Sequence, residues 1–127
     1  MKNNILKIAL IALLCVTTVF CSACFDFSLS EEDNFELVGE VSANVEYVKY
    51  LGYTCELYGT LKNNSNNSYS YVSIEFSIYD ADGNNLGTAM ANVNNIGPGE
   101  TWRFEAVLLS HPSTKPARYK LADITAY

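Results

Sequence analysis

Tyr71-Val72-Ser73-Ile74-Glu75-Phe76-Ser77-Ile78-Tyr79-Asp80 is the stretch that decides the fold of this 127-residue chain. Apolar side chains stand at every second position, which is the pattern of a β-strand with one buried and one solvated face. Residues 80–84 follow with Asp, Asn and a glycine, and residues 86–93 are again rich in apolar side chains. We therefore expect a β-hairpin, with Gly83 free to take the positive φ that such turns need.

Segments on both sides of this hairpin show the same strand pattern, at residues 101–109 and 119–127 as well as earlier in the chain. The polar run 63–68 and the run 94–100 are expected to be loops, because Asn and Ser bond their own backbone and Gly-Pro-Gly interrupts strand pairing. After residue 35, no window of about 11 residues has a helical period. The sequence predicts an all-β domain of about seven strands, and a two-sheet sandwich better than a closed barrel.

Residues of equal parity predict which strand faces are buried. Three sets of alternating residues are mostly apolar, and each is expected to form one buried face. They are Phe35, Leu37, Val41, Ala43 and Val45; Cys55, Leu57, Gly59 and Leu61; and Trp102, Phe104, Ala106 and Leu108.

The first 23 residues have the layout of an export signal, with two lysines, an uncharged run at residues 8–20 and a small-residue end. Ser22-Ala23 before Cys24 resembles a bacterial lipobox, which implies that Cys24 carries a lipid and becomes the new N-terminus. The apolar run spans about 20 Å as a helix, against roughly 30 Å of hydrocarbon. A cleaved signal therefore fits better than a retained signal anchor, which stays as the alternative.

Residues 24–34 are polar and acidic without strand or helix periodicity, and we expect a short tether between the lipid and a domain at residues 35–127. Three of the four cysteines lie in or at the end of the leader, so a disulfide framework is not implied. With lipid on Cys24, we expect Cys55 to be a free, buried thiol. Without lipid, a bridge between Cys24 and Cys55 stays open.

The charge balance of the exported part is strongly acidic. Lys2 and Lys7 are the only charged residues among the first 23, so the rest keeps 6 of 8 basic and all 14 acidic residues, a formal charge of −8. Nucleic acids and anionic lipid headgroups need clustered Lys and Arg, and both are therefore excluded as electrostatic partners. Membrane contact is expected through the lipid on Cys24 alone.

No arrangement of residues points to catalysis, a metal or a cofactor. His111 is the single histidine, and no nucleophile-elbow sequence accompanies the serines. Asp80, Asp82 and Asn84 have the spacing that opens a calcium loop, but position twelve is Ala91 where a bidentate Glu is needed. A hairpin turn is the favoured reading of these residues. One histidine and one free cysteine cannot complete a zinc site, and Glu75 and Glu105 are expected on solvated faces.

Nine tyrosines are the one compositional excess. The alternation places Tyr58, Tyr71 and Tyr79 away from the core, where they are expected either to pair across strands or to form a ligand-binding or partner-binding face.

The motif Phe76-Ser77-Ile78-Tyr79-Asp80 resembles the FxLYD domain family, with Ile78 where Leu is usual. Further segments resemble that family in order along residues 35–127, and they are Gly59-Thr60-Leu61-Lys62-Asn63, Asp82-Gly83-Asn84, Pro98-Gly99-Glu100-Thr101-Trp102-Arg103-Phe104 and Asp123-Ile124-Thr125-Ala126-Tyr127. The resemblance implies an immunoglobulin-like antiparallel β-sandwich on bacterial exported proteins and lipoproteins. It supplies no catalytic residue.

The expected function is therefore that of a non-enzymatic interaction module, lipid-anchored through Cys24 on the extracytoplasmic face of the cell membrane, with an envelope protein as partner. Secretion without a lipid is the alternative location. A carbohydrate-binding or small-ligand-binding module that uses Tyr58, Tyr71 and Tyr79 is the alternative function. Scattered tyrosines would weaken that alternative.

Overall fold

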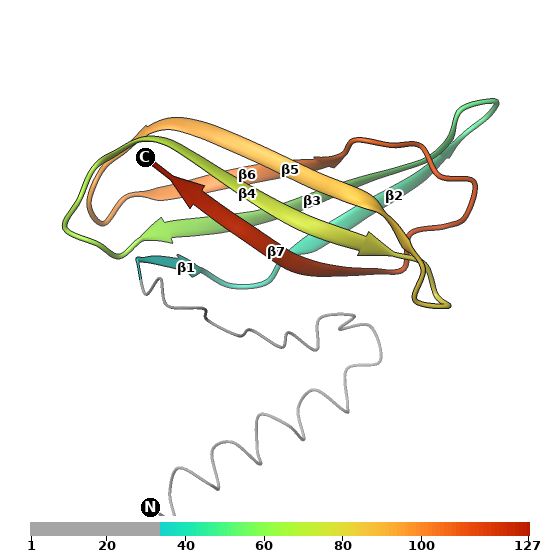
Figure 1. Ribbon diagram of the computed structural model, residues 1–127, viewed down its shortest axis with the longest axis horizontal. Coiled ribbons are helices and arrows are strands. Elements are labelled where there is room, and N and C mark those ends of the chain that lie inside the picture. The colour runs from blue at the N-terminus through green and yellow to red at the C-terminus, as the bar shows by residue number, and fades with distance from the viewer. Residues whose placement is uncertain (1–33) are drawn as a thin grey trace, which may run out of the picture.

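The structure, a computed structural model, describes residues 34–127. The predicted signal peptide at residues 1–23, the lipid site Cys24 and most of the predicted tether at 24–34 lie outside the described residues. Seven strands form the domain, and they are β1 (Phe35–Leu37), β2 (Ser42–Val48), β3 (Gly52–Asn63), β4 (Tyr69–Tyr79), β5 (Asn85–Ile96), β6 (Thr101–Leu108) and β7 (Arg118–Ala126) (Figure 1).

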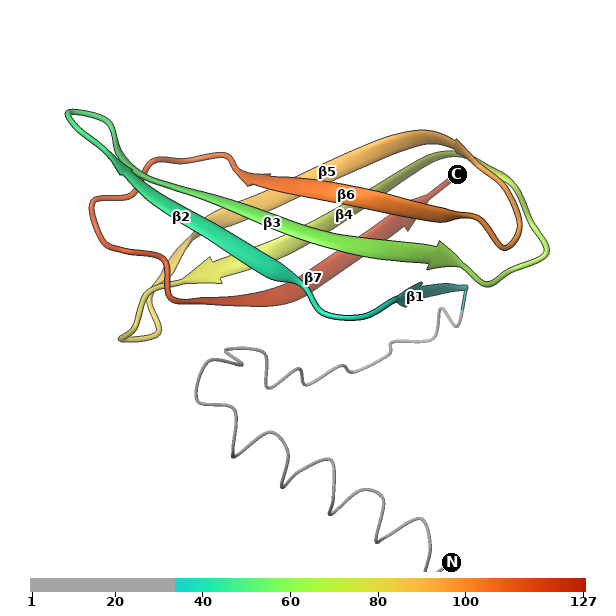
Figure 2. The same cartoon turned by 180° about the vertical axis from the view of Figure 1, so that it is seen from behind.

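All strand pairs are antiparallel, and the sheet follows the order β1-β3-β6-β5-β4-β7, with β2 also paired to β3. Only two residue pairs, Ala89 with Leu108 and Met90 with Val107, join β5 to β6. The sheet curls at this thin junction into two layers, β1, β2, β3 and β6 in one and β4, β5 and β7 in the other (Figures 1 and 2). The predicted all-β, immunoglobulin-like β-sandwich is confirmed.

The core lies between these two layers. The ring of Phe76 on β4 lies 5.7 Å from that of Phe104 on β6 and 6.1 Å from that of Tyr119 on β7. The residues of β4 predicted to be buried, Val72, Ile74, Phe76 and Ile78, are all fully buried. Alternation along this strand therefore predicted its core face correctly, because the inner face of β4 packs against the opposite layer of the sandwich.

Burial was predicted less well for the first strands. Phe35 is buried, but Val45 is only partly buried and Ala43 is exposed. The prediction of one continuous buried face over residues 35–45 was therefore wrong. The reason is topological: β1 and β2 both pair with β3, at Leu61–Asn63 and Gly52–Tyr58 respectively, so β2 is an edge strand that extends beyond the body of the sandwich.

The predicted hairpin of β4 and β5 is confirmed, with Phe76 opposite Ala89. Strand β5 continues to Ile96, so the expected break at residues 94–100 begins later than predicted. Asn95 sits at φ 59, a left-handed conformation that Asn tolerates better than most residues, and the strand passes through it.

Candidate functional site

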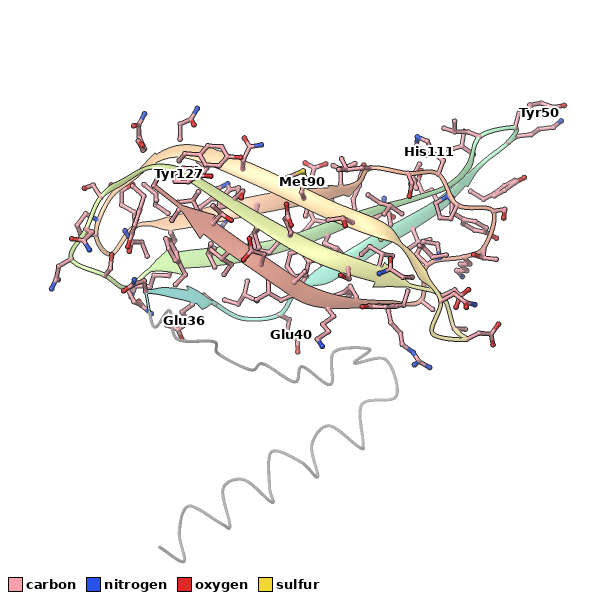
Figure 3. All side chains as sticks on the ribbon, viewed as in Figure 1. Glu36, Glu40, Tyr50, Met90, His111 and Tyr127 are labelled. Carbon is pink, nitrogen blue, oxygen red and sulfur yellow. The ribbon has the colours of Figure 1, made fainter. Side chains whose placement is uncertain are left out.

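The β2–β3 hairpin projects from one end of the sandwich (Figures 1 and 3). Its tip carries four of the exposed large hydrophobic side chains of residues 34–127. Residues 47–51, which we call the hairpin end, include Tyr50 at 91% exposure, Tyr47 at 64%, Leu51 at 50% and Val48 at 39%. Exposed apolar side chains that are contiguous, rather than scattered, mark surfaces that bind partners. Figure 3 shows Tyr50 at this tip, far from Tyr127 and Glu36 at the opposite end.

Tyr50 is held in a backbone conformation that suits glycine. The Leu51 amide donates to the Val48 carbonyl at 3.0 Å, which closes a four-residue turn with Tyr50 at its third position. Its φ is 69°, in the left-handed region where a bulky side chain is rare and costs about 1 kcal/mol or more. The ring gains a contact only with the neighbouring Lys49 ammonium, 4.8 Å from its centroid. Tyr50 is thus an exposed aromatic residue at a strained turn position, with little packing to offset the strain.

The hairpin is joined to the body by the loop that follows β6. The Tyr53 amide donates to the Pro112 carbonyl at 2.9 Å. Gly52 has φ 118, and a Cβ there would lie 2.8 Å from the carbonyl oxygens of both His111 and Pro112. Only glycine fits this close approach, which fixes the direction in which the hairpin leaves the sandwich.

The outer face beside the hairpin is acidic. Glu56 on β3 and Glu105 on β6 lie on the same face as Tyr58, and the Tyr58 hydroxyl donates to the Glu56 carboxylate. This hydrogen bond, with the negative charges of Glu105 and Glu56, raises the pKa of Tyr58 to about 12. Tyr58 therefore stays protonated at any physiological pH.

The three tyrosines predicted to share a face are not brought together. Tyr58 lies on β3 in one layer, whereas Tyr71 and Tyr79 lie on β4 in the other. Tyr79 follows Tyr71 by eight positions along one strand, a span of about 26 Å. Tyr71 stacks instead on Tyr127, with ring centroids 5.6 Å apart, so it pairs across strands. This separation weakens the alternative of a ligand-binding tyrosine face.

Asp80, the last residue of the motif Phe76-Ser77-Ile78-Tyr79-Asp80, organises the β4–β5 turn. Its carboxylate accepts hydrogen bonds from the Asp82 amide at 3.0 Å, the Asn84 amide at 2.8 Å and the Asn84 side chain at 2.9 Å. These donors, led by Asn84, lower the pKa of Asp80 below its usual value. Both carboxylate oxygens are used within the turn, which agrees with the hairpin-turn reading of residues 80–84. Phe76 and Ile78 of the motif are core, and Tyr79 is half-buried.

The residues weighed for chemistry lie apart from one another. Cys55 is a free, buried thiol, as expected, and burial followed by the charge of Glu56 raises its pKa to about 11. It is therefore a packing residue without thiolate character. His111 is exposed in the loop after β6. Among residues 34–127, no group of three His, Cys, Asp or Glu side chains is placed to hold a metal ion. No helix in this range is long and apolar enough to cross a membrane.

No family model matches this chain, and no curated protein matches it. Among solved structures, the chain is similar to the crystal structure of a β-glucuronidase from Bacteroides uniformis, at 20% sequence identity and a TM-score of 0.42. The likeness covers 68% of this chain and 13% of the β-glucuronidase chain. It bears on neither activity nor ligand.

The hairpin end was not predicted from the sequence. Residues 47–53 read Tyr-Val-Lys-Tyr-Leu-Gly-Tyr, with neither Asn, Asp nor Pro to mark a turn. The available signal was Gly52, which follows an apolar run and precedes the strand pattern of 55–61. A turn with Tyr in the glycine-type position contradicts local preference, so propensity alone could not locate it.

Proposed function

We propose that this protein is a lipid-anchored extracytoplasmic module that binds a protein partner in the cell envelope through the hairpin end. The observation that carries the proposal is the gathering of Tyr47, Val48, Tyr50 and Leu51 at one projecting tip. The export signal and the Cys24 lipobox support the location, and the resemblance of residues 35–127 to FxLYD domains supports the class of module.

The geometry suits a domain that presents its tip away from the anchoring membrane. The described chain begins at Asn34, beside β1, and the hairpin end lies at the opposite end of the long axis (Figures 1 and 2). Strand β3 has 12 residues and alone spans about 40 Å between these ends. Because the proposed tether at residues 24–34 joins the domain at its β1 end, we infer that the hairpin end faces away from the membrane, toward a protein partner.

The anchor is tested by intact mass and detergent partitioning of the protein from bacterial membranes. We expect a lipid-sized increment and membrane association in the wild type, and both lost in Cys24→Ala. Cys15→Ala is the matched control, because it removes a thiol of the apolar run, outside the proposed lipobox, and should leave both properties unchanged. An unmodified Cys24 with soluble release would contradict the anchored location and favour a secreted domain.

The interaction surface is tested separately by placing a photo-reactive amino acid at position 50 and, as control, at position 125 on β7. We expect a discrete cross-linked species in intact cells from position 50 and none from position 125. Equal cross-linking from both positions, or from neither, would contradict binding through the hairpin end.

A further inference from the structure

The second edge of β2 has no partner among residues 34–127. Within this range β2 pairs with β3 alone, in a register that runs without a shift from Ser42 opposite Tyr58 to Val48 opposite Gly52. Strand β1 occupies the same edge of β3 farther along and pairs at Leu37 with Leu61, so it does not cover β2. A row of backbone groups is therefore open to a further strand.

The backbone groups that face outward can be assigned. The Val48 carbonyl accepts from the Leu51 amide across the turn, and the Glu46 carbonyl accepts from the Thr54 hydroxyl, so even-numbered residues of β2 point toward β3. In an antiparallel pair, the residues between them point the other way. The Val41 carbonyl fits this rule, because it accepts from the Tyr119 hydroxyl of β7 at 2.8 Å. Beyond it, Ala43, Val45 and Tyr47 direct their amides and carbonyls outward.

The two faces beside this edge differ in chemistry. Val45 stands opposite buried Cys55 and is itself partly buried, and exposed Tyr47 contacts Tyr53 with ring centroids 5.1 Å apart, so the core-side face is apolar and only partly covered. The outer face carries Glu46 on β2 and Glu56 on β3, with Glu105 on the next strand, β6. An added strand would thus meet apolar side chains on one face and negative charge on the other.

The edge of β2 also lacks the features that commonly block strand addition. Its seven residues contain neither Lys nor Pro, and its register has no bulge. Strand β1, also an edge strand, has only three residues, and the long edge strand at the far end of the order, β7, carries Arg118 and Lys120 and has a register shift opposite Glu75 and Phe76. Bulges and lysines are the usual protection of an edge strand, so β7 is the guarded edge and β2 the accessible one.

We propose that the free edge of β2 is the docking site for an extended segment of the protein partner, in which apolar residues alternate with lysine or arginine. The segment adds a strand to β2, its apolar side chains cover Val45 and Tyr47, and its cations face Glu46 and Glu56. A second copy of this chain fits less well, because its formal charge of −8 after residue 23 repels itself. This inference rests on the proposed interaction role but not on the lipid anchor.

The test uses the full chain in mild detergent and a fluorescent peptide, acetyl-Val-Lys-Val-Lys-Val-Lys-Val-Lys-amide, with binding followed by anisotropy at low salt. We expect saturable binding that moves the amide resonances of Ala43, Val45 and Tyr47. The same peptide with Glu in place of Lys tests the charge, and the peptide methylated on every backbone nitrogen tests strand pairing while the protein stays unchanged. Neither should bind measurably.

Two substitutions locate the site on the protein. Glu46→Lys reverses a charge beside the edge and should weaken binding at least roughly fivefold, whereas the matched Glu75→Lys on β4 should change it less than about twofold. Val45→Pro removes an outward amide without breaking the β3 ladder and should weaken binding at least roughly tenfold, which corresponds to one lost hydrogen bond.

Several results would overturn the proposal. Equal binding of the methylated peptide would show that no strand is added, and resonance shifts on β7 instead of β2 would place the site on the other edge. A concentration-dependent dimer in sedimentation velocity, lost in Val45→Pro, would make a second copy the occupant. Absence of lipid on Cys24 would leave the peptide result untouched, so the two failures are distinguishable.

Discussion

Asn63, the last residue of β3, is expected to support the loops at the end of the sandwich opposite the hairpin end. Its side chain is fully buried and makes four hydrogen bonds. The amide nitrogen donates to the carbonyls of Asn67 and Gly97, at 2.8 and 3.0 Å. The amide oxygen accepts from the backbone amide and the hydroxyl of Ser65, at 3.0 and 2.6 Å. One residue thus joins the β3–β4 loop to the β5–β6 turn.

Replacement of Asn63 by Ala removes all four bonds at once. At about 0.5 to 1.5 kcal/mol for each bond, with some recovered by water, we expect the free energy of unfolding to fall by about 3 kcal/mol. For a domain of this size, that loss corresponds to a drop of roughly 12 to 24 °C in the thermal midpoint. Urea unfolding followed by the fluorescence of Trp102, the single tryptophan, measures the change.

The neighbouring residue supplies the control. Asn64 is exposed, and its side chain makes one hydrogen bond, to the Glu36 carboxylate at 2.8 Å. We expect Asn64→Ala to cost less than about 0.5 kcal/mol, as for most surface changes. A loss below about 1 kcal/mol in Asn63→Ala, or equal losses in the two variants, would refute the role assigned to Asn63.

Three further predictions follow from the turns and the buried thiol. Gly52→Ala, whose new Cβ meets two carbonyl oxygens at 2.8 Å, should lower the thermal midpoint more than Gly39→Ala, where φ is also positive but the space is open. Because hydrogen bonds lower the pKa of Asp80, its ionised carboxylate stabilises the folded domain at pH values above 3.8, the ordinary pKa of the group. This stabilisation is lost as the pH falls below that value. The loss of stability between neutral and acid pH should therefore be smaller in Asp80→Asn than in the wild type, as acid unfolding curves would show. With a pKa of about 11, Cys55 should react with a thiol reagent at pH 8 only after urea unfolding, as peptide mapping would show.

The buried face of a strand could be predicted from the sequence where that strand is central in its layer. Strand β4 alternates over its whole length, and the turn at residues 80–84 has the Asp and Asn side chains that bond their own backbone. Local chemistry and tertiary burial agree there, so the hairpin and the core residues Val72, Ile74, Phe76 and Ile78 were predicted correctly.

The candidate site was not predictable in the same way. Ala43 and Val45 have the parity of core residues, but whether that face is covered depends on which strand lies across from it, which alternation does not encode. The tyrosines show the same limit, because Tyr58 and Tyr71 both point outward from layers that the sequence could not assign. The free edge of β2 is a property of strand order alone.

Amide hydrogen exchange along β2, in the full chain without a partner, is the decisive experiment on whether the outer edge of this strand is free. A free outer edge of β2 predicts alternation: the amides of Asn44 and Glu46, directed toward β3, exchange slowly, and those of Ala43, Val45 and Tyr47 exchange rapidly. Uniform protection of all five amides would contradict it, because the outer edge of β2 would then already be paired and closed to a partner strand.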